Sequence, residues 1–300
     1  MNEAGSWPVG TAGFMSALRF LKRLSADDRR ALLDPRLVPL AEPDGELRPW
    51  YCGPHRLGWV PLERAQTMRA QWPQCHWQAD RLVWAAQDWS NEQRSRHLQH
   101  WLAAQRDAGQ LPGWRGEAYR FWTTPAYPPH PAQAGLFDCE RAGFRYLGLR
   151  SHAVHVNGFA EDGDLWCGRR SIHKATDPGL LDSLSAGGLT AGEGIWTTLH
   201  RELQEEAGLM VGPDQALQWL GSVDGSRSVP EGWHHETLWV FNLAVAAGQS
   251  PVNQDGEVAE FIRMTPEQVV SSVREDQWTI DAVLALQHGL GPAAAALLGA

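Results

Sequence analysis

Lysine is nearly absent from this chain of 300 residues: only Lys22 and Lys174 occur among 26 basic residues. The four cysteines are scattered and form no C-x-x-C pair, which argues against a zinc site and against a disulfide framework. The first ten residues lack the basic and apolar regions of a signal peptide, and we find no apolar run long enough to span a bilayer. These absences predict a cytoplasmic protein with reduced cysteines and no membrane partner.

Acidic residues are concentrated in the second half of the chain. Residues 151–300 hold 7 basic and 20 acidic residues, whereas residues 1–150 hold 19 and 15. This surplus argues against nucleic acid as the main partner, because a phosphate backbone attracts basic surfaces. It is compatible with a site that recruits a metal ion before an anionic substrate. Lys174 is the sole lysine of this acidic half.

The most informative stretch is GGLTAGEGIWTTLHRELQEEAGL, residues 187–209. Ile195, Leu199 and Leu203 recur at four-residue intervals, which predicts a helix with an apolar stripe over the second half of the stretch. The glycine-rich first half predicts a loop that leads into this helix.

Three glutamates occupy unusual positions on that helix. Glu202 and Glu206 fall among the apolar positions of the helical wheel, and Glu205 lies on the flank. A solvated acidic face is the simpler interpretation of Glu-x-x-Glu-Glu, but this position on the wheel counts against it. Burying such carboxylates is costly unless positive charge neutralises them, and Arg201 supplies only one charge. An all-oxygen ligand set of this kind suits Mg²⁺ or Mn²⁺.

The stretch resembles the Nudix box, G-x5-E-x7-R-E-U-x-E-E-x-G-U, in which U is aliphatic. Every defined position matches: Gly187, Glu193, Arg201, Glu202, Leu203, Glu205, Glu206, Gly208 and Leu209. The resemblance implies a Mg²⁺-dependent hydrolase that cleaves a diphosphate linked to another moiety. It also implies that Glu202, Glu205 and Glu206 bind the metal together with the region of the Gly187 carbonyl. Arg201 would then pair with Glu193 to hold the helix in register, and Glu202 is our first choice for the general base.

Two further groups of charged residues are candidates for the site. One is a basic group that is predicted to hold the diphosphate: Arg169, Arg170 and Lys174. The alternative is that the arginines form ion pairs with nearby acidic residues such as Asp177 and Asp182. Some Nudix branches take the base from a distant loop, for which the chain offers Glu257 first, although a solvated loop carboxylate is the simpler interpretation of any one such residue. The further carboxylates considered for that role are Asp255, Glu260 and Glu236.

Short segments elsewhere resemble the Nudix branch related to thiamine pyrophosphokinase, which carries an amino-terminal domain of unknown function (DUF4743-like). They are WRGEAYRF (114–121), ERAGF (140–144), HVNGF (155–159), WCGRRSIHKATDPGLLDSLSAGG (166–188) and DGEVAEF (255–261). The resemblance implies a small-molecule substrate, with oxo- and oxy-thiamine diphosphate converted to the monophosphate by some members. An ADP-ribose or nucleotide-sugar diphosphatase is the alternative, and a non-catalytic ligand-binding Nudix module is a weaker one. Isopentenyl diphosphate isomerase shares the R-S-x-x-K start, but its catalytic cysteine has no counterpart in LLDSLSAGG.

The pattern of elements predicts an α+β protein of two domains. Residues 14–140 alternate helices with hairpins and form a smaller α+β domain, whereas residues 141–290 suit the Nudix fold, a mixed sheet between helices. In the second domain we expect irregular chain before the box and a long polar loop over Asp224–Glu236. Ten of the 16 tryptophans precede residue 123, and we interpret them as core residues in preference to a ligand platform. A homodimer is the one oligomeric state that we expect as an alternative to a monomer.

Overall fold

The computed structural model describes residues 11–38, 41–123, 129–130, 132–212 and 217–299. The elements of the first half are α1 (Thr11–Arg23), α2 (Ala26–Leu32), a 3-10 turn (Pro35–Leu37), β1 (Leu47–Cys52), β2 (His55–Pro61), α3 (Leu62–Gln71), β3 (Cys75–Gln78), β4 (Arg81–Trp84), α4 (Asn91–Asp107), β5 (Ala118–Phe121), β6 (Phe137–Glu140) and α5 (Ala142–Tyr146). Those of the second half are β7 (Arg150–Phe159), β8 (Leu165–Arg170), β9 (Leu181–Asp182), β10 (Ser185–Gly188), α6 (Ile195–Ala207), β11 (Leu217–Val229), β12 (Gly232–Ala244), β13 (Val258–Met264), α7 (Pro266–Arg274) and α8 (Ile280–Leu298).

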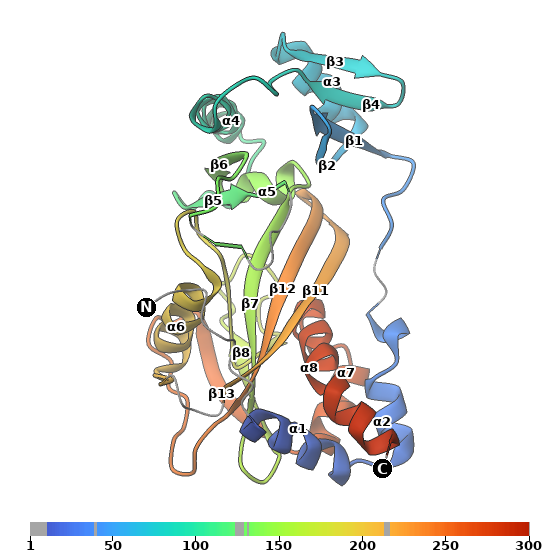
Figure 1. Cartoon of the computed structure of the whole chain (residues 1–300), viewed down its shortest axis with the longest axis vertical. Helices are drawn as coiled ribbons and strands as arrows, with labels where there is room; N and C mark the ends of the chain where they lie inside the picture. The colour runs from blue at the N-terminus through green and yellow to red at the C-terminus, as the bar shows by residue number, and fades with distance from the viewer. Residues whose placement is uncertain (1–10, 39–40, 124–128, 131, 213–216, 300) are drawn as a thin grey trace.

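A seven-stranded mixed sheet organises the second half. Its main path runs β11-β12-β7-β8-β13, and β10 pairs with β7 while β9 pairs with β8. Strands β12 and β7 are parallel, whereas β11 and β12 form a long antiparallel hairpin. Helix α6 lies on one side of the sheet, and α1, α7 and α8 lie on the other (Figure 1). The predicted α+β Nudix fold, with a mixed sheet between helices, is confirmed.

Two apolar layers fix the sheet between its helices. Leu199 and Leu203 of α6 pack against Val154, Val156 and other residues on one face. On the opposite face, alternate residues of the same strands meet α8 and α1, because successive side chains of a strand point to opposite sides. The sheet is therefore buried on both faces, and the polar side chains at its ends are the ones free for chemistry.

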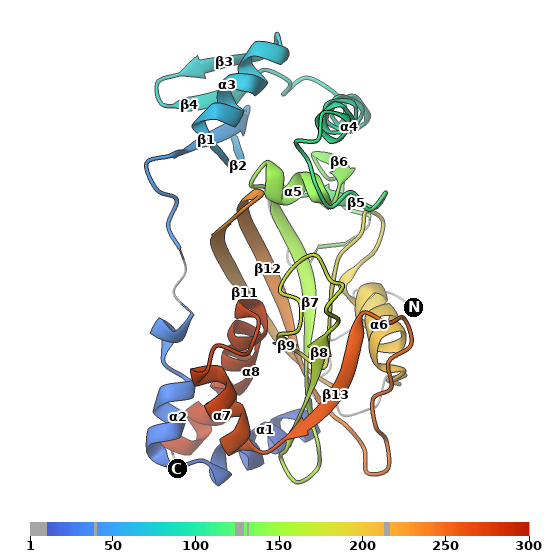
Figure 2. The same cartoon turned by 180° about the vertical axis from the view of Figure 1, so that it is seen from behind.

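A second core lies at the other end of the molecule. Strands β1–β4 form a four-stranded sheet in the order β2-β1-β4-β3, and α3 and α4 lie beside it (Figure 2). Trp50, Trp72 and Trp84 are each at most 1% exposed within it, with ring centroids 5.4–6.4 Å apart. These tryptophans are core residues, as predicted.

Helices α1 and α2 are far along the chain from the seven-stranded sheet, yet both contribute to its core. Phe20 of α1 packs edge-on against Phe159 of β7 at 5.8 Å, and Leu32 of α2 belongs to the same core. Both helices fall within the predicted 14–140 domain, yet they contribute to the core of the seven-stranded sheet. The division at residues 140 and 141 stays a prediction.

Two expectations for the second half are wrong in detail. The polar segment 224–236 is not a long loop, because β11 and β12 pair continuously from Ser222–Trp239 to Val229–Gly232. Residues 170–188 are not wholly irregular, since they contain the short strands β9 and β10. The 224–236 segment forms strands because its two halves pair with each other in the β11–β12 hairpin. Strands β9 and β10 instead depend on pairing with β8 and β7, which are long-range contacts that local composition does not reveal.

Helix α8 also changes the expectation about apolar runs. It is the one helix in the described part of the chain that is long and apolar enough to cross a membrane by length and composition, with 44% of its window buried. Leu286 and Leu290 on its inner face lie in the core beneath the sheet. Our prediction that no apolar run is long enough to span a bilayer is therefore wrong. A helix buried in a protein core meets the same criterion of length and composition.

Candidate functional site

The predicted box folds as a strand, a loop and a helix at one edge of the sheet. Strand β10 pairs with β7, the chain turns through residues 189–194, and α6 then runs from Ile195 to Ala207. The helix ends at Gly208, whose left-handed conformation (φ 64°) favours glycine. This arrangement turns one face of α6 toward the backbone of β10.

The three glutamates differ in burial as their wheel positions predict. The side chain of Glu206 is 8% exposed and that of Glu202 is 12% exposed, whereas that of Glu205 is 52% exposed. Glu202 and Glu206 therefore stand in the cleft between helix and sheet, and Glu205 stands at its rim.

Arg201 ties the glutamates to the loop before the helix. Its guanidinium donates from Nη2 to Glu193 Oε2 at 2.9 Å and from Nε to Glu193 Oε1 at 3.0 Å. Its Nη1 donates to Glu202 Oε1 at 2.7 Å and to Glu205 Oε2 at 3.1 Å. Burial opposes ionisation of Glu193, but the hydrogen bonds and charge of Arg201 hold the pKa of that carboxyl below its usual value. A two-pronged guanidinium is needed here, since an ammonium group lacks this planar geometry.

Gly187 is required by the position of Glu202. A Cβ atom at residue 187 would lie 1.9 Å from the carboxyl carbon of Glu202. The Glu202 carboxylate therefore packs directly on the backbone of β10, and any larger residue would displace it.

Glu206 shows why the cleft suits a cation. Its Oε2 accepts a hydrogen bond from the Ala186 amide at 2.9 Å. Burial and the neighbouring Glu202 raise the pKa of Glu206 to about 8, against the opposing influence of Lys174 and the Ala186 amide. More negative charge converges here than the local cations offset. The donor set of carboxylate oxygens therefore fits Mg²⁺ or Mn²⁺.

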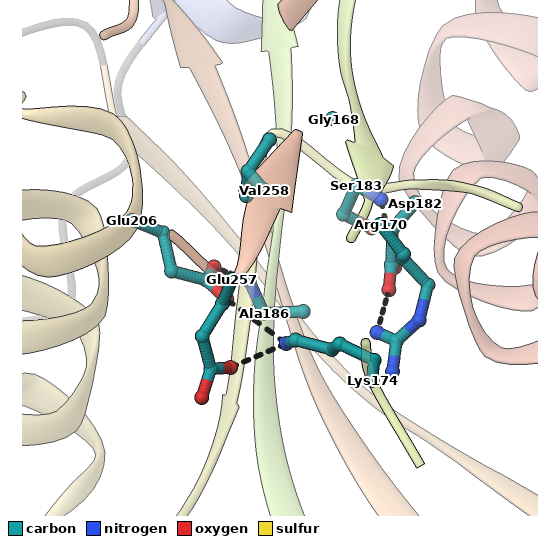
Figure 3. Close-up of a pocket in the computed structure, with 9 residues that line it drawn as sticks. All are labelled: Gly168, Arg170, Lys174, Asp182, Ser183, Ala186, Glu206, Glu257 and Val258. Carbon is teal, nitrogen blue, oxygen red and sulfur yellow. Dashed lines mark hydrogen bonds and ion pairs between the residues drawn. The ribbon is translucent and has the colours of Figure 1, made fainter. Parts of the chain in front are cut away.

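Lys174 and Glu257 meet Glu206 across a small pocket (Figure 3). The Lys174 ammonium forms an ion pair with Glu257 and lies 3.8 Å from Glu206 Oε1. Burial opposes ionisation of Glu257, but the hydrogen bond and charge of Lys174 keep the pKa of that carboxyl low. The structure thus brings together two residues that were predicted from separate loops.

The two predicted arginines have local partners. Arg170 Nη1 lies 2.7 Å from Asp182 Oδ2, and its other nitrogens donate to the backbone carbonyls of residues 176 and 177. Arg170 lines the same pocket as Lys174 (Figure 3). Arg169 pairs with Glu260 at 2.8 Å and donates to the Gly179 carbonyl. Binding a diphosphate would require either arginine to share these contacts.

Sequence reasoning named Asp182 as a possible partner of the arginines, which it is for Arg170, but missed the other polar residues at this site. Asp182 and Ser183 line the pocket, and His155 Nδ1 lies 3.1 Å from Ser183 Oγ. Tyr119 of β5 reaches the site from the first half of the chain: a Cβ atom at Gly188 would lie 1.7 Å from its hydroxyl oxygen. No spacing pattern marks these residues, because their proximity follows from strand pairing.

Comparisons with known proteins match the two parts of the chain to two domain families. Residues 149–286 match the NUDIX domain family, and residues 37–151 match the domain of unknown function DUF4743. The crystal structure of DR0079 from Deinococcus radiodurans is similar to 57% of this chain and 97% of its own, with 18% identity and a TM-score of 0.40.

Two curated relatives come from Arabidopsis thaliana. Nudix hydrolase 24, chloroplastic, is 37% identical over 63% of this chain and 51% of its own length. Nudix hydrolase 20, chloroplastic, is 35% identical over 61% of this chain and 48% of its own length. This chain spans about half the length of these relatives. Both are named as chloroplastic, and this finding overturns our prediction of a cytoplasmic location. The chain thus carries a Nudix domain over residues 149–286, preceded by a DUF4743 domain over residues 37–151.

Proposed function

We propose that the protein is a divalent-metal-dependent diphosphohydrolase. One observation carries the proposal: Glu202, Glu205 and Glu206 project from one helix beside the β10 backbone, and burial raises the pKa of Glu202 and Glu206. Glu202, Glu205, Glu206 and the Gly187 region would hold the metal. A divalent cation at that position supplies a Lewis acid that offsets the charge of a bound diphosphate.

The side chains of the cleft then have distinct tasks. Arg201 holds Glu193, Glu202 and Glu205 in a fixed relation, so that the carboxylates need no reorganisation when substrate binds. We assign the general base to Glu202, which would take a proton from the attacking water. Glu257 is the second candidate for the base, because it is half-exposed at the pocket edge.

The basic residues of the 169–174 segment would contact the diphosphate. Lys174 is the best placed of them, because its ammonium already lies between Glu206 and Glu257 in the pocket. Arg170 borders the same pocket, whereas Arg169 stands further out in its pair with Glu260. Substrate oxygens would compete with these carboxylates for the cations.

The amino-terminal half would shape the substrate side of the cleft. Ala191 donates its amide to the Ala118 carbonyl at 2.8 Å, which fixes β5 beside the loop that follows β10. On the same strand Tyr119 packs on Gly188, and Trp122, just beyond it, contacts His152 of β7 at 5.4 Å. We therefore propose that residues 14–140 and 141–290 act as two domains with one shared site. A homodimer is not required by this arrangement.

For the substrate we propose an oxo- or oxy-thiamine diphosphate that is hydrolysed to the monophosphate. The support is the resemblance of segments 155–159, 166–188 and 255–261 to the thiamine-related branch. An ADP-ribose or nucleotide-sugar diphosphate is the alternative, because the phosphate-facing residues would serve either class. A binding module without catalysis is disfavoured, since all the carboxylates of the box are present.

A phosphate-release assay with Mg²⁺ over a panel of diphosphates tests the proposal. The panel holds thiamine diphosphate, its oxo form, ADP-ribose, NADH and nucleotide sugars, with a nucleotidase-type phosphatase to reveal monophosphate products. The Glu206→Gln variant serves as the blank. Preference for the oxo form would support the thiamine branch, and activity on ADP-ribose alone would overturn the substrate but keep the chemistry. Failure on every compound would favour the binding module.

A further inference from the structure

Three side chains that the proposed hydrolysis does not use converge near the start of α8. His234 and Glu236 lie two residues apart on β12, so both point to the same face of the sheet. Asp281 reaches them from the first turn of α8. Further along the same face, Leu238 lies in the core beneath α8, so the cluster sits at the end of that apolar layer.

The ligand atoms of these side chains are close enough to share one ion. His234 Nε2 lies 3.4 Å from Asp281 Oδ2 and 3.8 Å from Glu236 Oε2, and the three atoms fall within 4.8 Å of one another. Metal bonds of about 2.0–2.2 Å place two ligand atoms of a tetrahedral ion roughly 3.4 Å apart. Small side-chain rotations would therefore complete the geometry.

An unpartnered nitrogen points into the cluster. His234 is 1% exposed, and its Nε2 is buried with no hydrogen-bond partner among the residues that the structure describes. Leaving such a group unsatisfied costs about 1–3 kcal/mol, so native structures seldom do it. The nitrogen faces two carboxylates, and a cation between them would satisfy all three groups.

Neighbouring residues hold the two carboxylates in place. Arg227 on β11 donates to both oxygens of Asp281, at 2.6 and 2.9 Å, and Ser151 on β7 donates to Glu236 Oε1 at 2.7 Å. Outer contacts of this kind commonly orient the ligands of a metal. Arg227 is the guanidinium that contacts Asp281 directly, and Arg141 acts on Glu236 electrostatically from further away.

We propose that His234, Glu236 and Asp281 form a second metal site, which takes a borderline divalent ion such as Zn²⁺. The imidazole nitrogen distinguishes it from the all-oxygen set on α6, because imidazole suits Zn²⁺ and its neighbours whereas Mg²⁺ prefers oxygen. Three protein ligands leave a fourth position for water or another oxygen ligand. The site is separate from the box and does not depend on the proposed hydrolysis.

The test measures Zn²⁺ and Co²⁺ binding to the full chain after chelation, in the presence of excess Mg²⁺ that occupies the α6 glutamates. We expect about one equivalent of Zn²⁺ to bind, and Co²⁺ to give visible absorption bands that Zn²⁺ abolishes. The His234→Gln and Glu236→Gln variants should each bind at least about tenfold more weakly. His235→Gln is the matched control, because this neighbouring histidine points to the opposite face of the sheet.

Glu236→Gln guards against a folding defect, since it keeps the size of the side chain and its contact with Ser151. Circular dichroism and thermal unfolding of each variant confirm that the fold is intact. The proposal is overturned if no Zn²⁺ binds beside Mg²⁺, or if both variants bind as the wild type does. In that case the cluster is only a polar contact between His234 and the two carboxylates. Loss of the bound ion in Glu205→Gln alone would also overturn it, because the ion would then belong to the box.

Discussion

Lys174 Nζ lies 3.8 Å from Glu206 Oε1, so the sole lysine of the acidic half reaches the buried end of the glutamate row. The same ammonium pairs with Glu257 from the segment before β13. A fixed positive charge thus stands beside the proposed metal ligands. It would repel a metal ion and attract a substrate phosphate, and these opposite effects can be measured separately.

Replacing Lys174 by Gln should separate metal affinity from substrate affinity. We expect KM for the substrate to rise about tenfold, since one charge-assisted contact is worth about 1.4 kcal/mol or more. The Mg²⁺ concentration for half-maximal rate should fall, because the repulsion is removed. Titrations of rate against substrate and against Mg²⁺ measure both, and the only other lysine, exposed Lys22, supplies the control Lys22→Gln. An unchanged or higher Mg²⁺ concentration for half-maximal rate in Lys174→Gln would contradict the predicted repulsion.

Replacing Glu205 or Glu206 by Gln should lower kcat at least about 10²-fold. A loss of about 2.7 kcal/mol in transition-state stabilisation produces this factor, and removing a metal ligand is expected to cost that much. Steady-state kinetics at saturating Mg²⁺ provide the measurement. Glu92→Gln on the exposed face of α4 controls for the loss of a carboxylate. Normal turnover in both variants, with metal still required, would show that other residues bind the ion.

Replacing Gly187 by Ala should reduce kcat/KM by about 10–100-fold while the fold is retained. The added methyl carbon would lie 1.9 Å from the Glu202 carboxyl carbon, which is far closer than van der Waals contact allows. It would therefore force the Glu202 side chain out of the cleft. Kinetics and circular dichroism of the variant test this. Gly212→Ala is the matched control, because a Cβ atom there meets no described atom within 4 Å. Equal activity of the two variants would mean that Glu202 is not needed in its observed place.

Stability should fall with acid through His152. Burial lowers the pKa of His152 to about 3, and the charge of Arg150 adds to the effect. His152 therefore binds a proton near pH 6.5 in the unfolded chain but stays neutral at that pH in the folded chain. Because the pKa is depressed in the folded state, the free energy of unfolding keeps its full contribution from neutral His152 above pH 6.5. That contribution is lost progressively as the pH falls from 6.5 to 3. The slope is up to about 1.4 kcal/mol per pH unit.

Urea unfolding between pH 7 and 4.5 measures this dependence. The His152→Gln variant keeps an acceptor for Trp239 Nε1, which lies 3.3 Å from His152 Nδ1. We expect the variant to be less stable at pH 7 but to lose less free energy of unfolding on acidification than the wild type. Parallel pH profiles of the two proteins would rule out this histidine as the source.

The sequence by itself determined the helix of the site and its orientation. The stripe of Ile195, Leu199 and Leu203 fixes which face of α6 is buried, because helical periodicity is a local property. The positions of Glu202 and Glu206 relative to that stripe then follow without knowledge of the rest of the fold. The start of α4 is set locally as well: Ser90 caps the helix, and its side chain accepts a hydrogen bond from the Gln93 amide.

The tertiary structure alone decided which distant residues meet. Strands β9 and β10 have two and four residues, too few for a periodic signal, and they exist because β8 and β7 supply their hydrogen bonds. The expected loop 224–236 is instead part of the β11–β12 hairpin, and the assembled sheet places Glu236 beside Asp281 of α8. It also gave Arg169 and Arg170 carboxylate partners. Sequence spacing specifies geometry within one helix or strand, whereas a contact between elements depends on how the whole sheet is assembled.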